Sequence, residues 1–203
     1  MGALSTTELL SLSNTTRFEI GPDLPEKRFG HCVARINSTH VFLAGGSSLK
    51  TYIFDERSYN FTEMDQLTYQ RSKPACAVVE SSNKTTLMVV GGECPREKDF
   101  CPWSREVLSL DADGNPEPDW ILHANKNLTG GWSHGGYVTD FEDTGLVLVG
   151  SKSYDSDVFP DSNVSEKIIT LDEEIFKLLP GTLEYGRSGS TAITVPKGSI
   201  SCE

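Results

Sequence analysis

The sequence contains a unit that recurs along most of its length. An apolar run that ends in glycine appears as STHVFLAGG at 38–46, KTTLMVVGG at 84–92 and DTGLVLVGS at 143–151. The run that precedes it appears as RFGHCVARI at 28–36, RSKPACAVVE at 71–80, GWSHGGYVTDF at 131–141 and RSGSTAITVP at 187–196. A self-similar unit of 43–60 residues predicts a repeat architecture, in which each unit folds as one supersecondary structure.

Each unit has the composition of four short β-strands separated by turns. In the first complete unit we expect strands near 31–36, 40–45, 50–55 and 59–64. The second strand of each unit (VFLA, LMVV and LVLV) is apolar throughout, which is typical of a strand buried on both faces. LDEEIFKLL at 171–179 has helical spacing, but the repeat register favours strand there. Four-stranded units around an axis form a β-propeller, so the expected fold class is all-β.

Certain residues recur at fixed places in these units. The first unit has Arg28, His31, Gly45, Gly46, Asp55 and Phe61, and the second has Arg71, Gly91, Gly92, Asp111 and Trp120. The third departs from this pattern with Gly131, Gly150-Ser151, Asp172 and Phe176, and Arg187 would open a further unit. An Arg-x-x-His opening, a strand ending in Gly-Gly, a later Asp and an aromatic residue after it resemble the kelch repeat.

The resemblance implies a kelch-type propeller with three complete blades, at about 28–66, 71–123 and 132–180. Half-blades at 6–25 and 187–203 would flank them. Kelch propellers have more blades than this, so we expect a fragment of a larger propeller, or a ring closed by pairing of the two half-blades. The glycines are expected to have positive φ and to allow close backbone approach, and the late aromatics, including Phe18 and Phe176, to fill the space between blades.

Charge and hydropathy narrow the possible partners. The net charge of −11, with 18 scattered basic residues, disfavours nucleic acid, because no basic run could neutralise a row of phosphates. No apolar run approaches the ~20 residues of a membrane-spanning helix. The first residues, MGALSTTELLSLSNTTRFEI, lack the basic and apolar regions of a signal peptide.

Asparagine usage indicates an extracellular protein. Six of the eight asparagines open an Asn-x-Ser/Thr acceptor for N-glycosylation, namely Asn14, Asn37, Asn60, Asn83, Asn127 and Asn163. Polar turn composition is the alternative explanation, because Asn, Ser and Thr gather in loops. Since no signal peptide is visible, we expect a piece of a longer secreted chain or ectodomain.

The five cysteines agree with an oxidising compartment. Cys94 and Cys101 lie in one polar segment, ECPREKDFCPW, and are predicted to close a small disulfide loop. Zinc would need two more ligands nearby, and the segment offers none. Cys32 and Cys76 lie in strand-like runs, where buried thiols are usual and a bridge is possible. Cys202 has no assigned partner.

Catalytic motifs are weak, and we predict no enzyme activity, cofactor or metal. GWSHG at 131–135 matches the nucleophile elbow with Ser133, but no following helix or suitable downstream histidine accompanies it. Some kelch-type propellers hold copper, and His31 and His134 occupy equivalent repeat positions. Capping of each unit's own turn explains these two histidines better. The other two of the four histidines are His40 and His123.

Two long segments depart from the repeat and are the candidate binding loops. Residues 92–104 include Arg96, Lys98, Phe100 and Trp103, and residues 151–165 include Tyr154 and Phe159. Both follow a second strand, so they would emerge on one propeller face, where loops on a rigid scaffold commonly bind partners. We therefore expect a non-catalytic extracellular scaffold for a protein or glycan. The alternatives are a segment of a propeller enzyme (copper oxidase-like or hydrolase) whose catalytic residues lie in missing blades, an intracellular kelch adaptor, and a truncated product with no function of its own. Either loop could also be a surface loop without a binding role.

Overall fold

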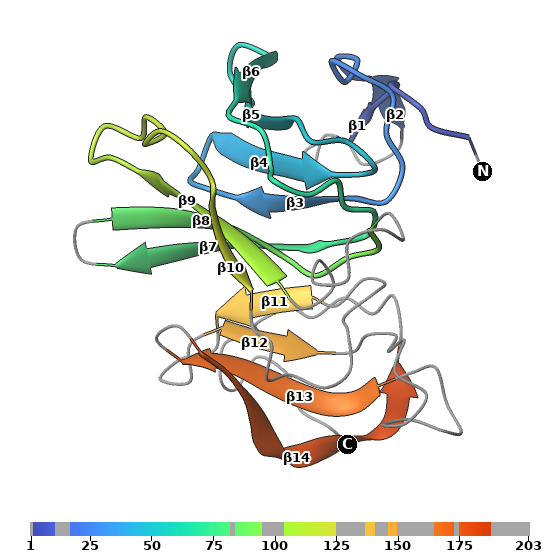
Figure 1. Cartoon of the computed structure of the whole chain (residues 1–203). Helices are drawn as coiled ribbons and strands as arrows, with labels where there is room; N and C mark the ends of the chain where they lie inside the picture. The colour runs from blue at the N-terminus through green and yellow to red at the C-terminus, as the bar shows by residue number, and fades with distance from the viewer. Residues whose placement is uncertain are drawn as a thin grey trace.

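The computed structural model describes residues 2–10, 17–81, 84–94, 104–124, 137–140, 146–149, 165–172 and 175–187, the last four ranges as backbone strands. This part of the 203-residue chain is all-β and contains no helix. It follows that the described residues include no helix long and apolar enough to cross a membrane. The described residues form three four-stranded antiparallel sheets and one two-stranded hairpin (Figure 1).

Sheet I corresponds to the first complete repeat. Its strands pair in chain order and are β3 (His31–Arg35), β4 (His40–Gly45), β5 (Thr51–Asp55) and β6 (Asn60–Met64). Each bound lies within one residue of its predicted position. The first-to-second and third-to-fourth connections lie at one end of the sheet, which we call the turn end. The second-to-third connection and the links between sheets lie at the opposite end, the loop end.

Sheets II and III repeat this order. Sheet II contains β7 (Ala75–Ser81), β8 (Lys84–Val90), β9 (Ser104–Leu110) and β10 (Ile121–Ala124). Sheet III contains β11 (Tyr137–Asp140), β12 (Leu146–Val149), β13 (Ser165–Asp172) and β14 (Ile175–Arg187). The strand prediction for LDEEIFKLL is confirmed at its described positions, because Leu171 pairs with Phe176 and Asp172 pairs with Ile175. β14 is longer than predicted and continues beyond residue 180 to Arg187. Its pairing with β13 contains two register shifts.

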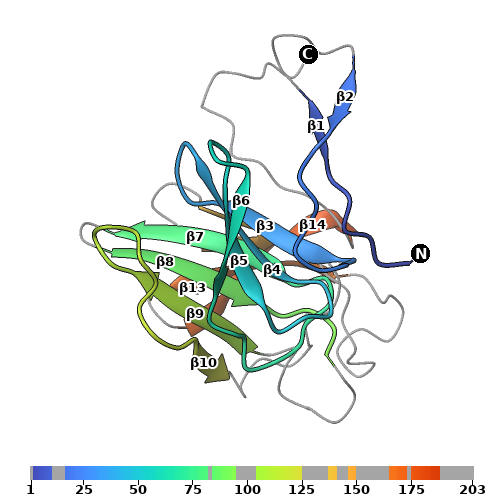
Figure 2. The same cartoon turned by 90° about the horizontal axis from the view of Figure 1, so that it is seen from above.

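A two-stranded hairpin precedes the sheets. It consists of β1 (Glu8–Leu10) and β2 (Phe18–Ile20), so two strands do occur within residues 6–25. In Figure 2 the hairpin extends away from the three sheets, although Leu4 bridges to Arg28 before β3. Phe18 is exposed on this hairpin rather than packed between sheets. The predicted C-terminal half-unit lies outside the described residues, apart from Arg187.

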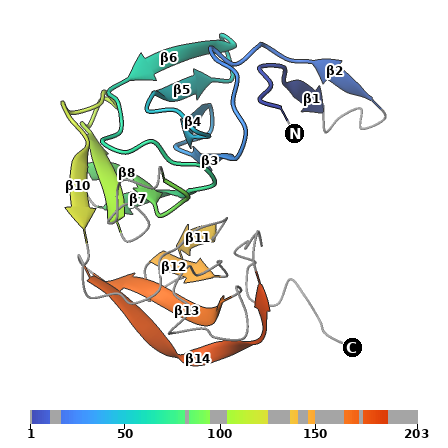
Figure 3. The same ribbon diagram turned by 45° about the vertical axis from the view of Figure 1, so that its right-hand side comes forward.

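The three sheets are arranged about a common centre (Figure 3). Their first strands lie innermost: β3 contacts β7, and β7 contacts β11. Their last strands, β6, β10 and β14, lie at the periphery. No sheet formed by the described residues closes on itself. Successive repeats therefore stand side by side, each turned relative to the one before.

Sheets I and II share a hydrophobic core formed largely by their second strands. Phe42 and Ala44 of β4 and Leu87 and Val89 of β8 are fully buried. Leu43 and Met88, which point to the opposite faces of these strands, are also buried, so burial on both faces is confirmed for the apolar runs of β4 and β8. Burying each large apolar side chain contributes about 1.5–3 kcal/mol.

The late aromatics of the first two repeats pack in different places: Trp120 lies between two sheets, whereas Phe61 packs within its own sheet. Trp120, directly before β10, stacks on Phe42 of sheet I with ring centroids 5.7 Å apart. Its indole N–H donates to the Asp65 carbonyl at 3.0 Å, so Trp120 fills the space between sheets I and II. Phe61 lies in β6 and packs on Phe54 of the same sheet, with centroids 4.7 Å apart.

Residues 65–74 connect sheet I to sheet II. Their last part, residues 71–74, is called the link and runs between the two glycine pairs at the loop end. The Ser47 N–H donates to the Arg71 carbonyl at 2.9 Å. Ser72 and Glu93 exchange backbone hydrogen bonds of 2.8 and 2.7 Å. The link therefore joins the second-to-third connections of both sheets through backbone hydrogen bonds.

This arrangement explains the glycines. Gly45 and Gly92 have φ values of +71° and +94°, a region that residues with side chains disfavour. A Cβ on Gly45 would lie 2.5 Å from Cγ of Pro74, and one on Gly92 would lie 2.9 Å from the Ser72 carbonyl oxygen. The sequence-based expectation of positive φ and close backbone approach is confirmed at these positions.

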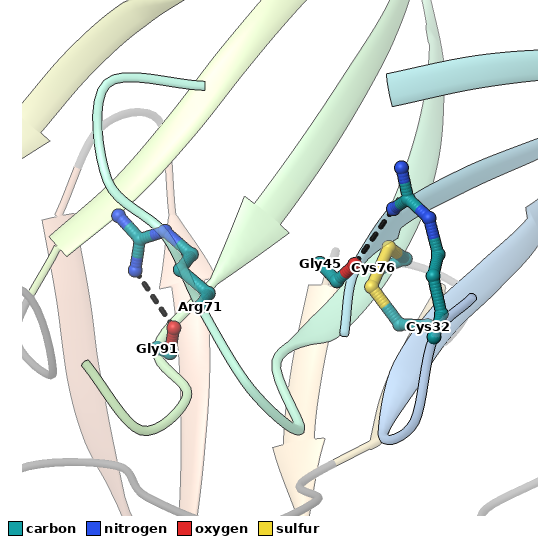
Figure 4. Close-up of a disulfide and its surroundings, with 6 residues drawn as sticks. Cys32, Gly45, Arg71, Cys76 and Gly91 are labelled. Atoms are coloured by element: carbon teal, nitrogen blue, oxygen red, sulfur yellow. Dashed lines mark hydrogen bonds between the residues drawn. A yellow bond between two sulfur atoms is a disulfide. The ribbon is translucent and has the colours of Figure 1, made fainter. Parts of the chain in front are cut away.

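A disulfide joins Cys32 of β3 to Cys76 of β7, with a Cα–Cα distance of 5.5 Å (Figure 4). It cross-links the innermost strands of neighbouring sheets. Of the two possibilities for these cysteines, the bridge is therefore the one that occurs. The two residues are 44 apart in the chain, and in the loop-entropy model closing such a loop contributes about 4 kcal/mol.

Candidate functional site

Arg71 opens the second repeat, and its side chain is completely buried. It forms an ion pair with Glu106 of β9 at 3.0 Å. It also donates to the Gly91 carbonyl at 2.7 Å (Figure 4). A further hydrogen bond of 2.7 Å goes to the Ser104 hydroxyl. Burial lowers the pKa of Arg71, and the Glu106 carboxylate opposes this change. Arg71 thus ties the link between sheets to the second and third strands of sheet II.

Arg28 does the same in sheet I. Its guanidinium donates to the carbonyls of Gly45 and Lys50, each at 2.7 Å. It also forms an ion pair with Glu26 and lies over the ring of Tyr52, 5.1 Å from the centroid. Like Arg71, it connects the entry of its sheet to the glycine at the end of the second strand.

Each arginine contacts one carboxylate and one aromatic ring, but the two sheets place these partners at opposite positions. In sheet I the carboxylate, Glu26, lies two residues before the arginine, and the ring, Tyr52, lies on the third strand. In sheet II the ring, Tyr69, lies two residues before Arg71 and 5.8 Å from its guanidinium, and the carboxylate, Glu106, lies on the third strand. Tyr52 and Glu106 are equivalent in register, because each pairs with the residue two positions before the first glycine. Each arginine therefore ties the entry of its own sheet to a carboxylate, an aromatic ring and the carbonyl of a glycine at the end of the second strand.

Asp55 and Asp111 organise the third-to-fourth connections. The Asp55 carboxylate accepts from the Ser58 hydroxyl at 2.7 Å and from the Arg57 N–H at 2.9 Å. The Asp111 carboxylate accepts from the Asn115 N–H at 2.8 Å. These hydrogen bonds lower the pKa of both carboxyl groups. Both aspartates therefore stabilise turns, at equivalent places in the two repeats.

A cleft of about 470 Å³ lies at the turn end, between sheet I and the Asp113–Pro116 turn of sheet II. Cross-strand pairing shows which face of sheet I lines it: Asp55 is opposite Asn60, and Ile53 is opposite Thr62. Its lining residues are Ile36, Asn37, His40, Ile53, Asp55, Ser58, Asn60, Thr62, Leu110, Asp113, Gly114, Asn115 and Pro116. The cleft thus combines an apolar floor with amides, hydroxyls and carboxylates.

A smaller hollow of about 220 Å³ lies at the loop end and is lined by Ser47, Gln70, Ser72, Glu93 and Cys94. The Ser72 hydroxyl is buried there and has no hydrogen-bond partner among the described residues. This hollow adjoins the start of the predicted 92–104 binding loop. The loop end therefore offers polar groups beside a segment expected to contact a partner.

Most residues of the two predicted binding loops lie outside the described residues. These are Arg96, Lys98, Phe100, Trp103, Tyr154 and Phe159. Cys94 is disulfide-bonded, whereas Cys101, its predicted partner, also falls outside, so that pairing stays a prediction. Gly150 lies outside as well, and Asp172 is described only as the last residue of β13.

Two of the six glycosylation acceptors are described, and both are exposed and line the turn-end cleft. The side-chain oxygen of Asn37 accepts from the N–H groups of Thr39 and His40, each at 2.9 Å. Asn60 begins β6. The remaining acceptors lie outside the described residues and are Asn14, Asn83, Asn127 and Asn163.

The described part of the chain contains only some of the residues considered above as catalytic or metal-binding candidates. Ser133 and His134 lie outside it. Partial burial, followed by the positive charge of Arg28, lowers the pKa of His31. Among the described residues, no group of three or more His, Cys, Asp or Glu side chains could hold a metal ion.

The chain matches no protein-family model, and the comparison with curated proteins finds no significant relative. Its function must therefore be inferred from its own residues. The sequence did contain one unused signal: Cys32 and Cys76 lie 44 residues apart, close to one repeat length, in the first strands of adjacent units. The cleft had no comparable signal, because its two walls come from different repeats.

Proposed function

We propose that the chain is a segment of a kelch-type β-propeller that serves as a non-catalytic extracellular scaffold and binds a protein or glycan through its loop end. The observation that carries this proposal is the repeated construction of sheets I and II. In each, an arginine before the first strand donates to the carbonyl of the glycine that ends or follows the second strand. The first strands of successive sheets are adjacent, as blades around an axis require.

The cysteines and asparagines support the extracellular location. The Cys32–Cys76 disulfide would persist in an oxidising compartment and would be reduced in the cytosol. Asn37 and Asn60 are exposed in the folded chain, as glycan acceptors must be. These features favour an ectodomain segment over the intracellular adaptor.

The loop end is favoured for binding because its backbone is held rigidly. The 71–74 link is hydrogen-bonded to the second-to-third connections of both sheets, and buried Arg71 fixes its entry. A scaffold of this kind positions the loops that emerge from it, and binding residues are commonly found on such loops. The predicted 92–104 loop begins at this point with Gly92 and Glu93.

The proposal is tested with the full chain secreted from eukaryotic cells behind a heterologous signal peptide. Its mass is measured before and after N-glycosidase, and the protein is then probed against arrays of glycans and of extracellular protein domains. We expect glycans on several acceptors and a bound probe that is lost in Trp103→Ala and Arg96→Ala. Arg35→Ala is the matched control, because Arg35 is an exposed cation near the turn end.

Two results would contradict the proposal. Unmodified asparagines and free thiols in well-folded secreted protein would make an intracellular adaptor the better hypothesis. Binding that survives the loop variants but is lost in Arg35→Ala would move the binding surface to the turn end.

A further inference from the structure

The turn-end cleft has a glycan acceptor inside it. Asn60 begins β6, where it pairs with Asp55 of β5. Side chains of directly paired residues point to the same face of a sheet, so Asn60 shares the cleft face with Asp55, just as Thr62 shares it with Ile53. Asn60 is nevertheless exposed, so its amide is accessible for modification.

The chemistry of the cleft fits a sugar. Ile53, Leu110 and Pro116 give an apolar floor against which the C–H face of a pyranose ring can pack. Asp113 and Asn115 belong to the opposite wall and offer a carboxylate and an amide to sugar hydroxyls and N-acetyl groups. The volume of about 470 Å³ lies within the usual range for small-ligand clefts, about 300–1,000 Å³.

We propose that the first sugars of an N-linked glycan on Asn60 occupy the turn-end cleft between sheets I and II. This inference rests on the extracellular location proposed above. Glycosylation joins Nδ2 of Asn60 to C1 of the first sugar, with loss of one amide proton and departure of the lipid pyrophosphate carrier. The tether gives the sugars an effective concentration of about the millimolar order, so even a cleft of weak intrinsic affinity is filled.

Asn37, which also lines the cleft, is compatible with a second glycan. Its Oδ1 accepts from the N–H groups of Thr39 and His40, so its Nδ2 is left for the sugar while the turn stays intact. Glycans at Asn37 and Asn60 would together cover the turn end. A protein partner would then meet the molecule at the opposite end, where the predicted binding loops begin.

The test uses the secreted full chain and three variants of one acceptor. Asn60→Gln and Thr62→Ala both abolish the acceptor, whereas Thr62→Ser keeps it and serves as the matched control. We expect Asn60 to be occupied and to retain oligomannose, because trimming enzymes cannot reach a glycan held in a cleft. Native digestion with an endoglycosidase should release it more slowly than the glycans at other acceptors, and unfolding should remove that difference.

Thermal unfolding gives an independent measurement. Asn60→Gln and Thr62→Ala should each lower Tm by about 2–4 °C relative to wild type, whereas Thr62→Ser should not. If Asn60 is unoccupied while other acceptors carry glycans, or if its glycan is processed and released like the rest with no change in Tm, this inference is wrong and the extracellular proposal stands. Absence of glycans from every acceptor would overturn both.

Discussion

At the scale of single residues, the most informative feature is the pair of buried arginines. Arg71 and Glu106 are both fully buried, and Glu106 also accepts from the N–H groups of Thr68 and Tyr69. A buried ion pair repays its desolvation only when further hydrogen bonds satisfy the remaining donors and acceptors. Here those bonds come from Thr68 and Tyr69, just before the 71–74 link, and from Ser104 of β9, so the pair fixes how the link enters sheet II.

Removing the charge of Glu106 should therefore destabilise the folded protein strongly. Glu106→Gln should lower the free energy of unfolding by about 3–5 kcal/mol, because the Arg71 charge would be buried without its counterion. Glu117→Gln removes the exposed Lys84–Glu117 pair and should change it by only about 0–1 kcal/mol. Urea unfolding of the two variants measures the difference. Equal effects would mean that Arg71 is solvated and that the network does not hold the link.

At the scale of strands and turns, the glycine pairs combine two constraints. Gly45 requires a left-handed backbone and also contacts Pro74 of the link. Gly114, in the third-to-fourth connection of sheet II, has φ +84° but nothing within 4 Å of a hypothetical Cβ. Comparing the two positions separates backbone strain from close packing.

Gly114→Ala should cost about 1–2 kcal/mol, the penalty of a left-handed conformation alone. Gly45→Ala should cost about 2–5 kcal/mol, because the clash with Pro74 adds to that penalty. Chemical denaturation of both variants is the measurement. Equal losses would show that the link can move away from Gly45 and that the close approach is unimportant.

Local patterning explains which elements could be predicted. The strands of sheet I are evident because β-branched and aromatic residues gather between turn residues, and Asp55 and Asp111 occur where turns need a side-chain acceptor. The repeat pattern identifies Trp120 as a residue between sheets, and the structure confirms this, whereas Phe61, which lies inside β6, packs on Phe54 of its own sheet. The exchange of ring and carboxylate around the arginines could not be predicted from one repeat alone. It involves two positions at once, the one two residues before the arginine and the one on the third strand.

At the scale of the whole molecule, contacts between sheets determine how the repeats pack against one another. The repeat pattern predicts several sheets, but contacts between sheets depend on residues far apart in the chain. The Cys32–Cys76 bridge and the Phe42–Trp120 stack are such contacts, and the turn-end cleft exists only because sheet I and the Asp113–Pro116 turn come together.

The most direct test of this arrangement is non-reducing peptide mapping of the secreted chain. Because β3 and β7 lie side by side, the account predicts a peptide pair joined through Cys32 and Cys76. Free thiols at both positions in folded protein, or either cysteine joined to Cys202 instead, would contradict the side-by-side packing of sheets I and II.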